Sequence, residues 1–330
     1  MRVSLPAHLG RLERVDRLGV GGFATVWLYH DAELRSDVAV KALADNWAQR
    51  LDIRERFLEE ARILRRADSD HVVRVYDIGE VDSTPYFVMT YADLGSLAHL
   101  VEEGEPVTPG RVVDLVRQAA AGLSVLHELG VVHRDVKPQN LLLRSGGSAG
   151  ERLLVADLGV AKAMLHASGL TQVVGTPAYM APEQVTGEAI TPRADVHALA
   201  AVAYQMLTGQ LARTGSVSDL VHASLPTAPS RLVELPREVD DVLLRALDPD
   251  PARRHPDVQS LADELAEALP MPAPPARPRS MTRLEDPPTV VTDSVAEPER
   301  RGAPVLLTLI CLLILGAGFA GAYAVTTLVR

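Results

Sequence analysis

The chain has 330 residues, of which 47% are hydrophobic and only 4% aromatic. That length is enough for a large domain whose core is built mainly from aliphatic and alanine side chains. A net charge of -10 at pH 7 argues against a nucleic-acid partner, because proteins that bind phosphate backbones present a basic face. The single cysteine, Cys311, excludes an intramolecular disulfide and fits a reducing compartment.

The first part of the chain has the pattern of strands, and the part beyond residue 108 has the pattern of helices. The predicted strands are 26–29, 38–40 and 86–89. The predicted helices are 54–66, 112–129 and 194–207. We therefore expect an α+β architecture, with a small strand-rich lobe before a larger helical lobe.

A glycine-rich turn between two strands comes just before the predicted strand 26–29. Gly19, Gly21 and Gly22 lie in it, and glycines let backbone amides approach a phosphate with no Cβ in the way. Taken alone this is a weak signal, since glycine turns join many strands. A P-loop or Rossmann motif is excluded, because no Gly-Lys-Ser/Thr follows and the next element is a strand.

Only three lysines occur among the 33 basic residues: Lys41, Lys137 and Lys162. Lys41 ends an apolar strand, where a lysine needs an anionic partner. We expect Glu60 of the following helix to be that partner, with Glu59 on the exposed side.

A second group of chemically active residues lies in the sequence His-Arg-Asp-Val-Lys-Pro-Gln-Asn. Asp135 can accept or orient a hydroxyl proton, and Lys137 can neutralise a transferring phosphoryl group. Asn140 offers an oxygen that suits Mg²⁺. Asp157 follows an apolar strand-like run and is a second candidate ligand for Mg²⁺ bridging phosphates.

Together with Ala-Pro-Glu at 181–183, these motifs resemble the protein kinase superfamily, and most closely the bacterial eukaryotic-like (Hanks-type) Ser/Thr kinases. The resemblance covers 12–269 and implies a bilobal fold, with an N-lobe of about 12–91 and a C-lobe of about 92–269. The N-lobe would hold a small antiparallel sheet and one key helix. The implied activity is transfer of the γ-phosphoryl of ATP, with Mg²⁺ or Mn²⁺, to Ser/Thr hydroxyls of protein substrates in signal transduction.

The resemblance also implies a role for each motif residue. Asp135 is the catalytic base, Lys137 lies beside the γ-phosphate, and Lys41 contacts the α- and β-phosphates. Asn140 and Asp157 hold the metal. The implied ATP-binding residues, with Met89 as gatekeeper and the hinge after it, are Leu18, Gly19, Gly21, Gly22, Val26, Ala39, Lys41, Glu60, Met89, Tyr91, Ala92 and Leu142.

Three further residues have implied structural roles. Asp195 is expected to brace the catalytic loop, and Glu183 to pair with Arg254, with Arg253 as the alternative. Arg134 beside the catalytic aspartate is typical of kinases that are switched by phosphorylation of the activation loop. The candidate phosphorylation sites, in order of preference, are Thr171, Ser168 and Thr176.

Two other functions are compatible with the fold. A membrane scaffold without activity usually lacks one of the lysine, the catalytic aspartate or the magnesium aspartate, and all three are present. A small-molecule phosphotransferase shares the lobes but lacks the complete Ala-Pro-Glu segment. Both are therefore less favoured than an active protein kinase.

The C-terminal part has a different composition. Residues 270–302 are proline-rich and charged, which predicts a disordered linker. Residues 303–328 contain a long uncharged run and are expected to form one transmembrane helix. Arg300 and Arg301 precede this run and only Arg330 follows it, so we expect a single-pass protein of the cell membrane with a cytoplasmic kinase domain.

Small residues recur at four-residue spacing in the predicted transmembrane helix. The pairs are Gly316 and Ala320, Ala317 and Gly321, and Gly318 and Ala322. Such spacing lets two helices approach closely, so a homodimer is a candidate assembly.

Overall fold

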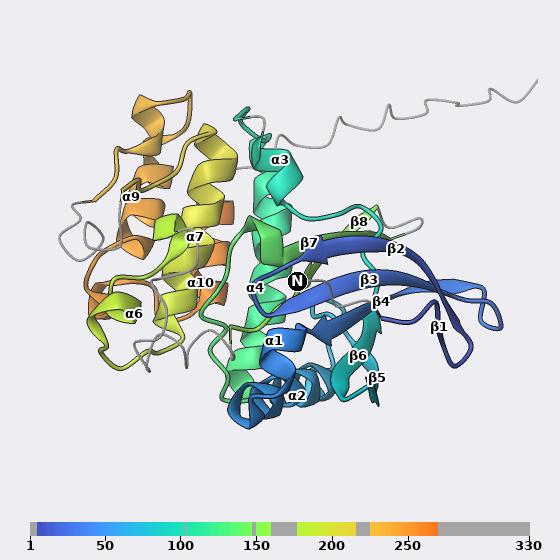
Figure 1. The fold of residues 1–330 in the computed structure, drawn as a ribbon. Helices are drawn as coiled ribbons and strands as arrows, with labels where there is room; N and C mark the ends of the chain where they lie inside the picture. Colours follow the sequence, from blue (N-terminus) through green and yellow to red (C-terminus); the bar gives the residue numbers. More distant parts are fainter. Residues whose placement is uncertain (1–4, 103, 147–149, 160–176, 216–224, 270–330) are drawn as a thin grey trace, which may run out of the picture. The chain divides into compact units, whose positions relative to one another are not determined.

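The computed structural model describes residues 5–102, 104–146, 150–159, 177–215 and 225–269 (Figure 1). The expected linker, the expected transmembrane helix and the three candidate phosphorylation sites Ser168, Thr171 and Thr176 lie outside these residues. Among the described residues, no helix combines the length and the apolar character needed to cross a membrane.

Six strands form one antiparallel sheet in the order β1-β2-β3-β4-β6-β5. Their bounds are β1 His8–Leu9, β2 Leu12–Val20, β3 Ala24–Asp31, β4 Ser36–Leu43, β5 Val75–Val81 and β6 Thr84–Thr90. The three predicted strands lie in β3, β4 and β6, so the strand-rich first lobe is confirmed. β4 continues to Leu43, so Lys41 lies inside the strand rather than at its end.

The sheet begins before residue 12, the expected start of the domain, because β1 pairs with β2. The residues before β1 cover one face of the sheet. Leu5 is 1% exposed and packs with Tyr29 and Val40 in a small apolar cluster. The Tyr29 hydroxyl donates to the Pro6 carbonyl at 2.8 Å. This cluster keeps water from one face of the sheet and leaves the other face for the main core.

Two helices follow β4 in the first lobe, α1 Asp45–Ala48 and α2 Leu51–Arg66. The expected key helix is α2, which begins earlier than the predicted residue 54, and the short α1 precedes it. The apolar side of α2 buries Phe57, Ala61 and Leu64, and the helix packs against β5 and β6. Glu60 is buried on the same side, which brings its carboxylate toward the sheet.

The second lobe is mainly helical, as predicted, and holds one small hairpin (Figure 1). Its α-helices are α3 Ala98–Glu102, α4 Pro109–Glu128, α6 Glu183–Thr186, α7 Arg193–Thr208, α9 Arg237–Ala246 and α10 Val258–Ala268. Its short 3-10 turns are η1 Pro138–Asn140, η3 Pro177–Tyr179, η4 Pro229–Arg231 and η5 Pro251–Arg253. The antiparallel hairpin joins β7 Leu141–Ser145 and β8 Glu151–Val155.

Helix α7 is the centre of this lobe, with every residue from Ala194 to Thr208 buried. A helix that is apolar on all sides belongs in a core, and α7 packs against α4, α9 and α10. The helix ends at Gly209, whose φ of 70° is a left-handed conformation that favours glycine. The charged Asp195, which α7 buries, therefore needs partners inside the lobe.

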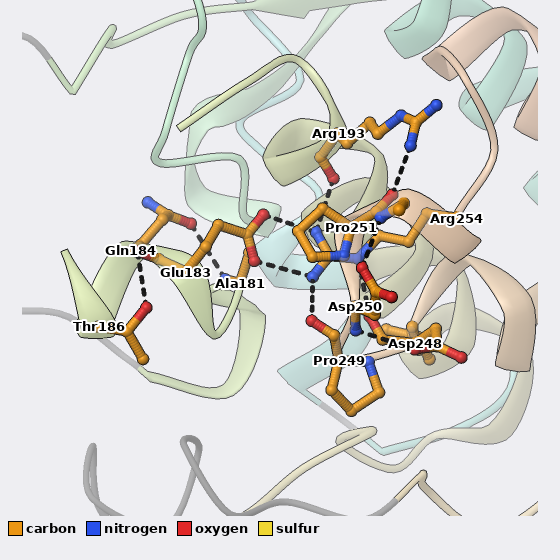
Figure 2. A network of polar contacts seen from close by, with 12 residues as sticks. Ala181, Glu183, Gln184, Thr186, Arg193, Asp248, Pro249, Asp250, Pro251 and Arg254 are labelled. Atoms are coloured by element: carbon orange, nitrogen blue, oxygen red, sulfur yellow. Dashed lines mark hydrogen bonds and ion pairs between the residues drawn. The ribbon is translucent and has the colours of Figure 1, made fainter. Parts of the chain in front are cut away.

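A fully buried ion pair joins α6 to the segment after η5 (Figure 2). Arg254 donates to both carboxylate oxygens of Glu183, at 2.7 and 2.8 Å. Its remaining N–H groups donate to the carbonyls of Asp248, Pro249 and Arg193 at 2.7 to 3.1 Å. All five guanidinium donors are thus satisfied, which offsets the cost of burying the charge. The neighbouring Arg253 has a side chain that is 74% exposed.

Removing this buried guanidinium should destabilise the fold strongly. We expect Arg254→Met to lower the free energy of unfolding by about 3–5 kcal/mol, because Glu183 is left as an uncompensated buried charge. The matched control is Arg253→Met, which removes an exposed arginine and should change stability by less than about 0.5 kcal/mol. Urea unfolding followed by circular dichroism compares the two. Equal losses of unfolding free energy in both variants would contradict the assignment of Arg254 as the buried partner of Glu183.

Buried His197 in α7 should make stability depend on pH. Burial, and then the charges of Arg254 and Arg213, lower the pKa of His197 well below its ordinary value. An unfolded histidine takes up a proton below about pH 6.5, whereas folded His197 does not until much lower pH. The unfolded state therefore binds more protons in this window, and stability falls as pH falls from 7.

We expect His197→Phe to reduce the difference in unfolding free energy between pH 7.5 and pH 5.5 by about 1 kcal/mol. The control is His99→Phe, since the His99 side chain is 70% exposed. Urea unfolding at both pH values measures the change. If the difference in unfolding free energy between the two pH values is as large in His197→Phe as in the wild type, His197 is not the cause of the pH dependence.

Candidate active site

The glycine-rich turn lies between β2 and β3, next to the strand that holds Lys41. Val26 of β3 pairs with Lys41 of β4, and Gly19 of β2 pairs with Val26. Lys41 Nζ donates to Glu60 Oε1 at 2.7 Å, and both residues are buried. The expected pair is thus present, and Glu59 instead lies 3.2 Å from Arg62 on the exposed side of α2.

Lys41 also contacts Asp157, which comes from the second lobe. Burial alone lowers the pKa of Lys41, but the carboxylates of Asp157 and Glu60 outweigh it, so the pKa lies above its usual range. The ammonium is therefore charged throughout the physiological pH range. A fixed cation at this place, held by two carboxylates, is suited to bind an anionic group that approaches the sheet.

The loop after α4 is fastened to α7 by one carboxylate. Asp195, which is 0% exposed, accepts from the backbone N–H groups of His133 at 2.8 Å and Arg134 at 2.9 Å. It also lies 2.8 Å from His127 Nε2. Asp195 is thus placed as expected against the loop, and its bonds hold Arg134 at a φ of 67°. For a non-glycine residue this left-handed conformation is strained and persists only where surrounding bonds fix it.

Three polar side chains meet at this loop. Asn140 Nδ2 donates to the carbonyl and to Oδ2 of Asp135, at 2.8 and 2.9 Å. Lys137 Nζ lies 3.0 Å from Asp135 Oδ2. The side chains of Asp135 and Lys137 are 18% and 15% exposed, so both can reach solvent or a substrate. A carboxylate beside an ammonium can orient a hydroxyl and neutralise a phosphoryl group.

Asp157 follows β8 and is brought against the same loop by close backbone contacts. His133 Nε2 lies 3.0 Å from the Ala156 carbonyl, and Gly159 N–H donates to the His133 carbonyl at 3.1 Å. A Cβ at Gly159 would meet that carbonyl at 3.1 Å, so the approach favours glycine. Asp157 itself has a φ of 59° and a side chain that is 43% exposed.

The residues expected to hold Mg²⁺ fit a metal that arrives with phosphate. The described residues contain no group of three or more His, Cys, Asp or Glu side chains that could hold a metal ion alone. Asp157 offers a carboxylate, and both bonds from Asn140 to Asp135 use Nδ2, so neither uses the lone pairs of Oδ1. When Mg²⁺ binds together with phosphates, it needs only a few oxygen ligands from the protein. One carboxylate and one amide oxygen can supply them.

The residues expected around the adenine ring come from both lobes. Ala39 of β4 pairs with Met89 of β6, and both are buried. Val26, Tyr91 and Leu142 are partly buried and pack against the main core. Leu18 on β2 is 44% exposed, and Ala92 follows β6 with intermediate burial. Val26, Ala39 and Leu142 thus supply apolar side chains from β3, β4 and β7.

Some residues near the site were missed in the sequence. His127 gave no signal, because a lone histidine near a helix end is common. Gln184 Nε2 donates to the Arg134 carbonyl at 2.8 Å and joins the Ala-Pro-Glu segment to the loop. Trp47 of α1 contacts the glycine-rich turn, although an aromatic residue there has no motif of its own.

The family model of the protein kinase domain matches residues 12–266. Serine/threonine-protein kinase PknB of Mycobacterium leprae is 34% identical over 295 residues, or 85% of this chain and 46% of the relative. A Ser/Thr kinase of Corynebacterium efficiens, drp72, is 37% identical over 74% of this chain and 48% of the relative. The chain thus spans less than half the length of these curated relatives.

The fold is also similar to a solved structure. The crystal structure of the Mycobacterium tuberculosis PknI kinase domain superimposes with a TM-score of 0.64 and 28% identity, covering 80% of this chain and all of that one. The two-lobed architecture and the Lys41, Asp135 and Asp157 motifs agree with the family match. The chain belongs to the protein kinase family and has the bilobal protein kinase fold.

Proposed function

We propose that the chain is an ATP-dependent serine/threonine protein kinase that transfers the γ-phosphoryl of ATP to Ser/Thr hydroxyls of proteins. The observation that carries the proposal is the contact of Lys41 with both Glu60 and Asp157. This contact joins the first lobe, the helix α2 and the end of β8 in one charged cluster. The similarity to kinases that are named as Ser/Thr-specific supports the same activity.

Catalysis in this proposal is mostly positioning and electrostatic stabilisation, since phosphoryl transfer needs little covalent help from the protein. Lys41 neutralises the α- and β-phosphates, and the amides of Gly19, Gly21 and Gly22 close over them. Asn140 and Asp157 hold Mg²⁺ or Mn²⁺, which when bound neutralises phosphate charge. The charged state of Lys41 supports its role, because a neutral amine would bind phosphate weakly.

The hydroxyl that receives the phosphoryl group meets the catalytic loop. Asp135 orients this hydroxyl and accepts its proton, while Lys137 neutralises the γ-phosphoryl group beside it. The bonds from Asn140 Nδ2 and Lys137 Nζ fix the Asp135 carboxylate in one orientation, which supports this role. A nucleophile and a phosphoryl group held in line need little further ordering before reaction.

The adenine ring would lie between apolar side chains from both lobes. Val26 and Ala39 cover one face and Leu142 the other, with Leu18 at the edge and Met89 as gatekeeper. Backbone groups at Tyr91 and Ala92 would bind the ring edge. The burial of Ala39 and Met89, with partial burial of Val26 and Leu142, supports this arrangement.

The acceptor class and the control of activity follow from the sequence. Lys137 two residues after Asp135 resembles Ser/Thr kinases rather than Tyr kinases. Phosphorylation of the activation loop at Thr171, with Ser168 and Thr176 as alternatives, would place a phosphate for Arg134 to bind.

We extend the proposal to the organisation of the whole chain. Residues 12–269 form the kinase domain, 270–302 a disordered linker and 303–328 one transmembrane helix. The kinase domain faces the cytoplasm of a single-pass protein in the cell membrane. The long uncharged run supports the helix, and its small-residue spacing supports a homodimer.

Substitution of the catalytic residues should abolish activity without unfolding the chain. We expect Lys41→Met and Asp135→Asn each to lower kcat/KM by at least about 100-fold, because each removes a charge that the transition state needs. The matched control is Asp114→Asn, on the exposed side of α4, which should keep wild-type activity. Transfer from labelled ATP to the chain and to protein substrates is measured with Mg²⁺.

Peptide mapping of the labelled chain then locates the acceptor. We expect label first at Thr171, and none in Asp135→Asn. A folded Lys41→Met variant with unchanged activity contradicts the proposed mechanism. A wild type that binds ATP but labels neither itself nor other proteins would favour a membrane scaffold.

Removal of the predicted transmembrane helix should release the chain from the membrane. We expect the full chain to sediment with membranes, since a helix of about 20 apolar residues spans a bilayer. A chain without 303–328 should stay in the supernatant, whereas the control that lacks only the linker 270–302 should still sediment. If the full chain stays in the supernatant, the membrane assignment is wrong.

A further inference from the structure

The glycine-rich turn is held from the side by a tryptophan of α1. Trp47 Nε1 donates to the Gly22 carbonyl at 2.8 Å. The ring of Trp47 lies against the ring of Phe23, with 5.2 Å between centroids and 34° between planes. One side chain thus makes a polar and an apolar contact with two successive residues at the tip of the turn.

Backbone bonds complete this attachment. Ala44, which directly precedes α1, donates its N–H to the Phe23 carbonyl at 2.8 Å. Within the turn, Gly21 N–H donates to the Ala24 carbonyl at 2.8 Å. Phe23 and Trp47 are partly buried and pack against the main core. The tip of the turn is therefore joined to the segment between β4 and α2.

We propose that Trp47 is a positioning residue that holds the glycine-rich turn in the conformation that binds the phosphates of ATP. The inference rests on the proposed function and deepens it. Two glycines, Gly21 and Gly22, make the turn costly to order, since glycine loses more conformational freedom than other residues. A turn that is already held before ATP arrives loses less freedom on binding, so ATP binds more tightly.

The position of α1 also links the turn to the charged cluster. α1 packs against α2, which carries Glu60, the partner of Lys41. A change in the position of Trp47 would therefore displace both the turn and α2. The indole N–H of Trp47 bonds Gly22 and its ring contacts Phe23, so Trp47 acts on the turn through these two residues.

The chain offers a matched control, because it contains only one other tryptophan, Trp27. Trp27 lies on β3, with Arg14 and Arg17 over its ring at 4.9 and 5.9 Å. Its buried Nε1 has no hydrogen-bond partner in the part of the chain that the structure describes. Trp27→Phe thus removes an N–H that makes no bond, whereas Trp47→Phe removes one that does, and both keep an aromatic ring.

The first measurement is steady-state kinetics of the purified full chain. We expect Trp47→Phe to raise KM for ATP roughly three- to tenfold, as for the loss of one neutral hydrogen bond, with kcat within about twofold of the wild type. Trp27→Phe should leave both constants unchanged. An unchanged or lowered KM in Trp47→Phe, or an equal rise in both variants, overturns the inference.

Hydrogen exchange without nucleotide gives a readout that does not depend on activity. We expect the amides of Gly21 and Ala44 to exchange faster in Trp47→Phe than in Trp27→Phe, because the turn is no longer held. Unchanged exchange overturns the inference even if KM rises. A wild type that uses no ATP contradicts the proposed function and this role with it. If the wild type is active and Trp47→Phe has the same KM and the same exchange rates, only the role of Trp47 is contradicted and the proposed function stands.

Discussion

The arrangement of the site depends on one buried carboxylate, that of Asp195 in α7. A buried carboxylate is tolerated only where donors satisfy it, and here the donors are two successive backbone N–H groups and a histidine ring. These bonds fix the peptide at His133 and Arg134 against α7, a buried helix of the second lobe. They also hold Arg134 in its strained left-handed conformation, so the direction in which the chain continues to Asp135 is set by the core.

The same constraint extends to the other lobe through a chain of short contacts. The loop fixed by Asp195 presents the His133 ring to the Ala156 carbonyl and its own carbonyl to Gly159. These two contacts flank Asp157, which therefore points from a fixed backbone toward Lys41. Lys41 in turn bonds Glu60 and so sets the position of α2 against the sheet. The site is thus one connected set of polar contacts that begins in the core of the second lobe.

Some of these polar contacts could be predicted from the sequence, because the charged residues that make them lie at recognisable spacings. The partner of Lys41 could be named because a charge in an apolar strand requires an opposite charge, whereas the pairing of Glu183 with Arg254 came from the resemblance to protein kinases. Strand β5 was missed because most of its residues are exposed and their pattern does not alternate. Trp47, His127 and the covering residue Leu5 were missed for another reason. Their roles arise from tertiary contacts between segments that are distant in the sequence. A single aromatic residue, histidine or leucine has no local pattern from which such a contact can be predicted.

Among the described residues, the buried ion pairs of Arg254 and of Lys41 differ in a way that separates stability from function. Arg254 has all five donors satisfied inside the lobe and Glu183 is 2% exposed, so this pair has no capacity for another partner and serves the fold. Lys41 is buried to a similar degree, but its second carboxylate, Asp157, has a side chain that is 43% exposed. An anion can therefore approach this cluster from the Asp157 side and share its cation. Because a compact ammonium with three rotatable donors adapts to such a change more easily than a planar guanidinium, lysine suits the second position and arginine the first.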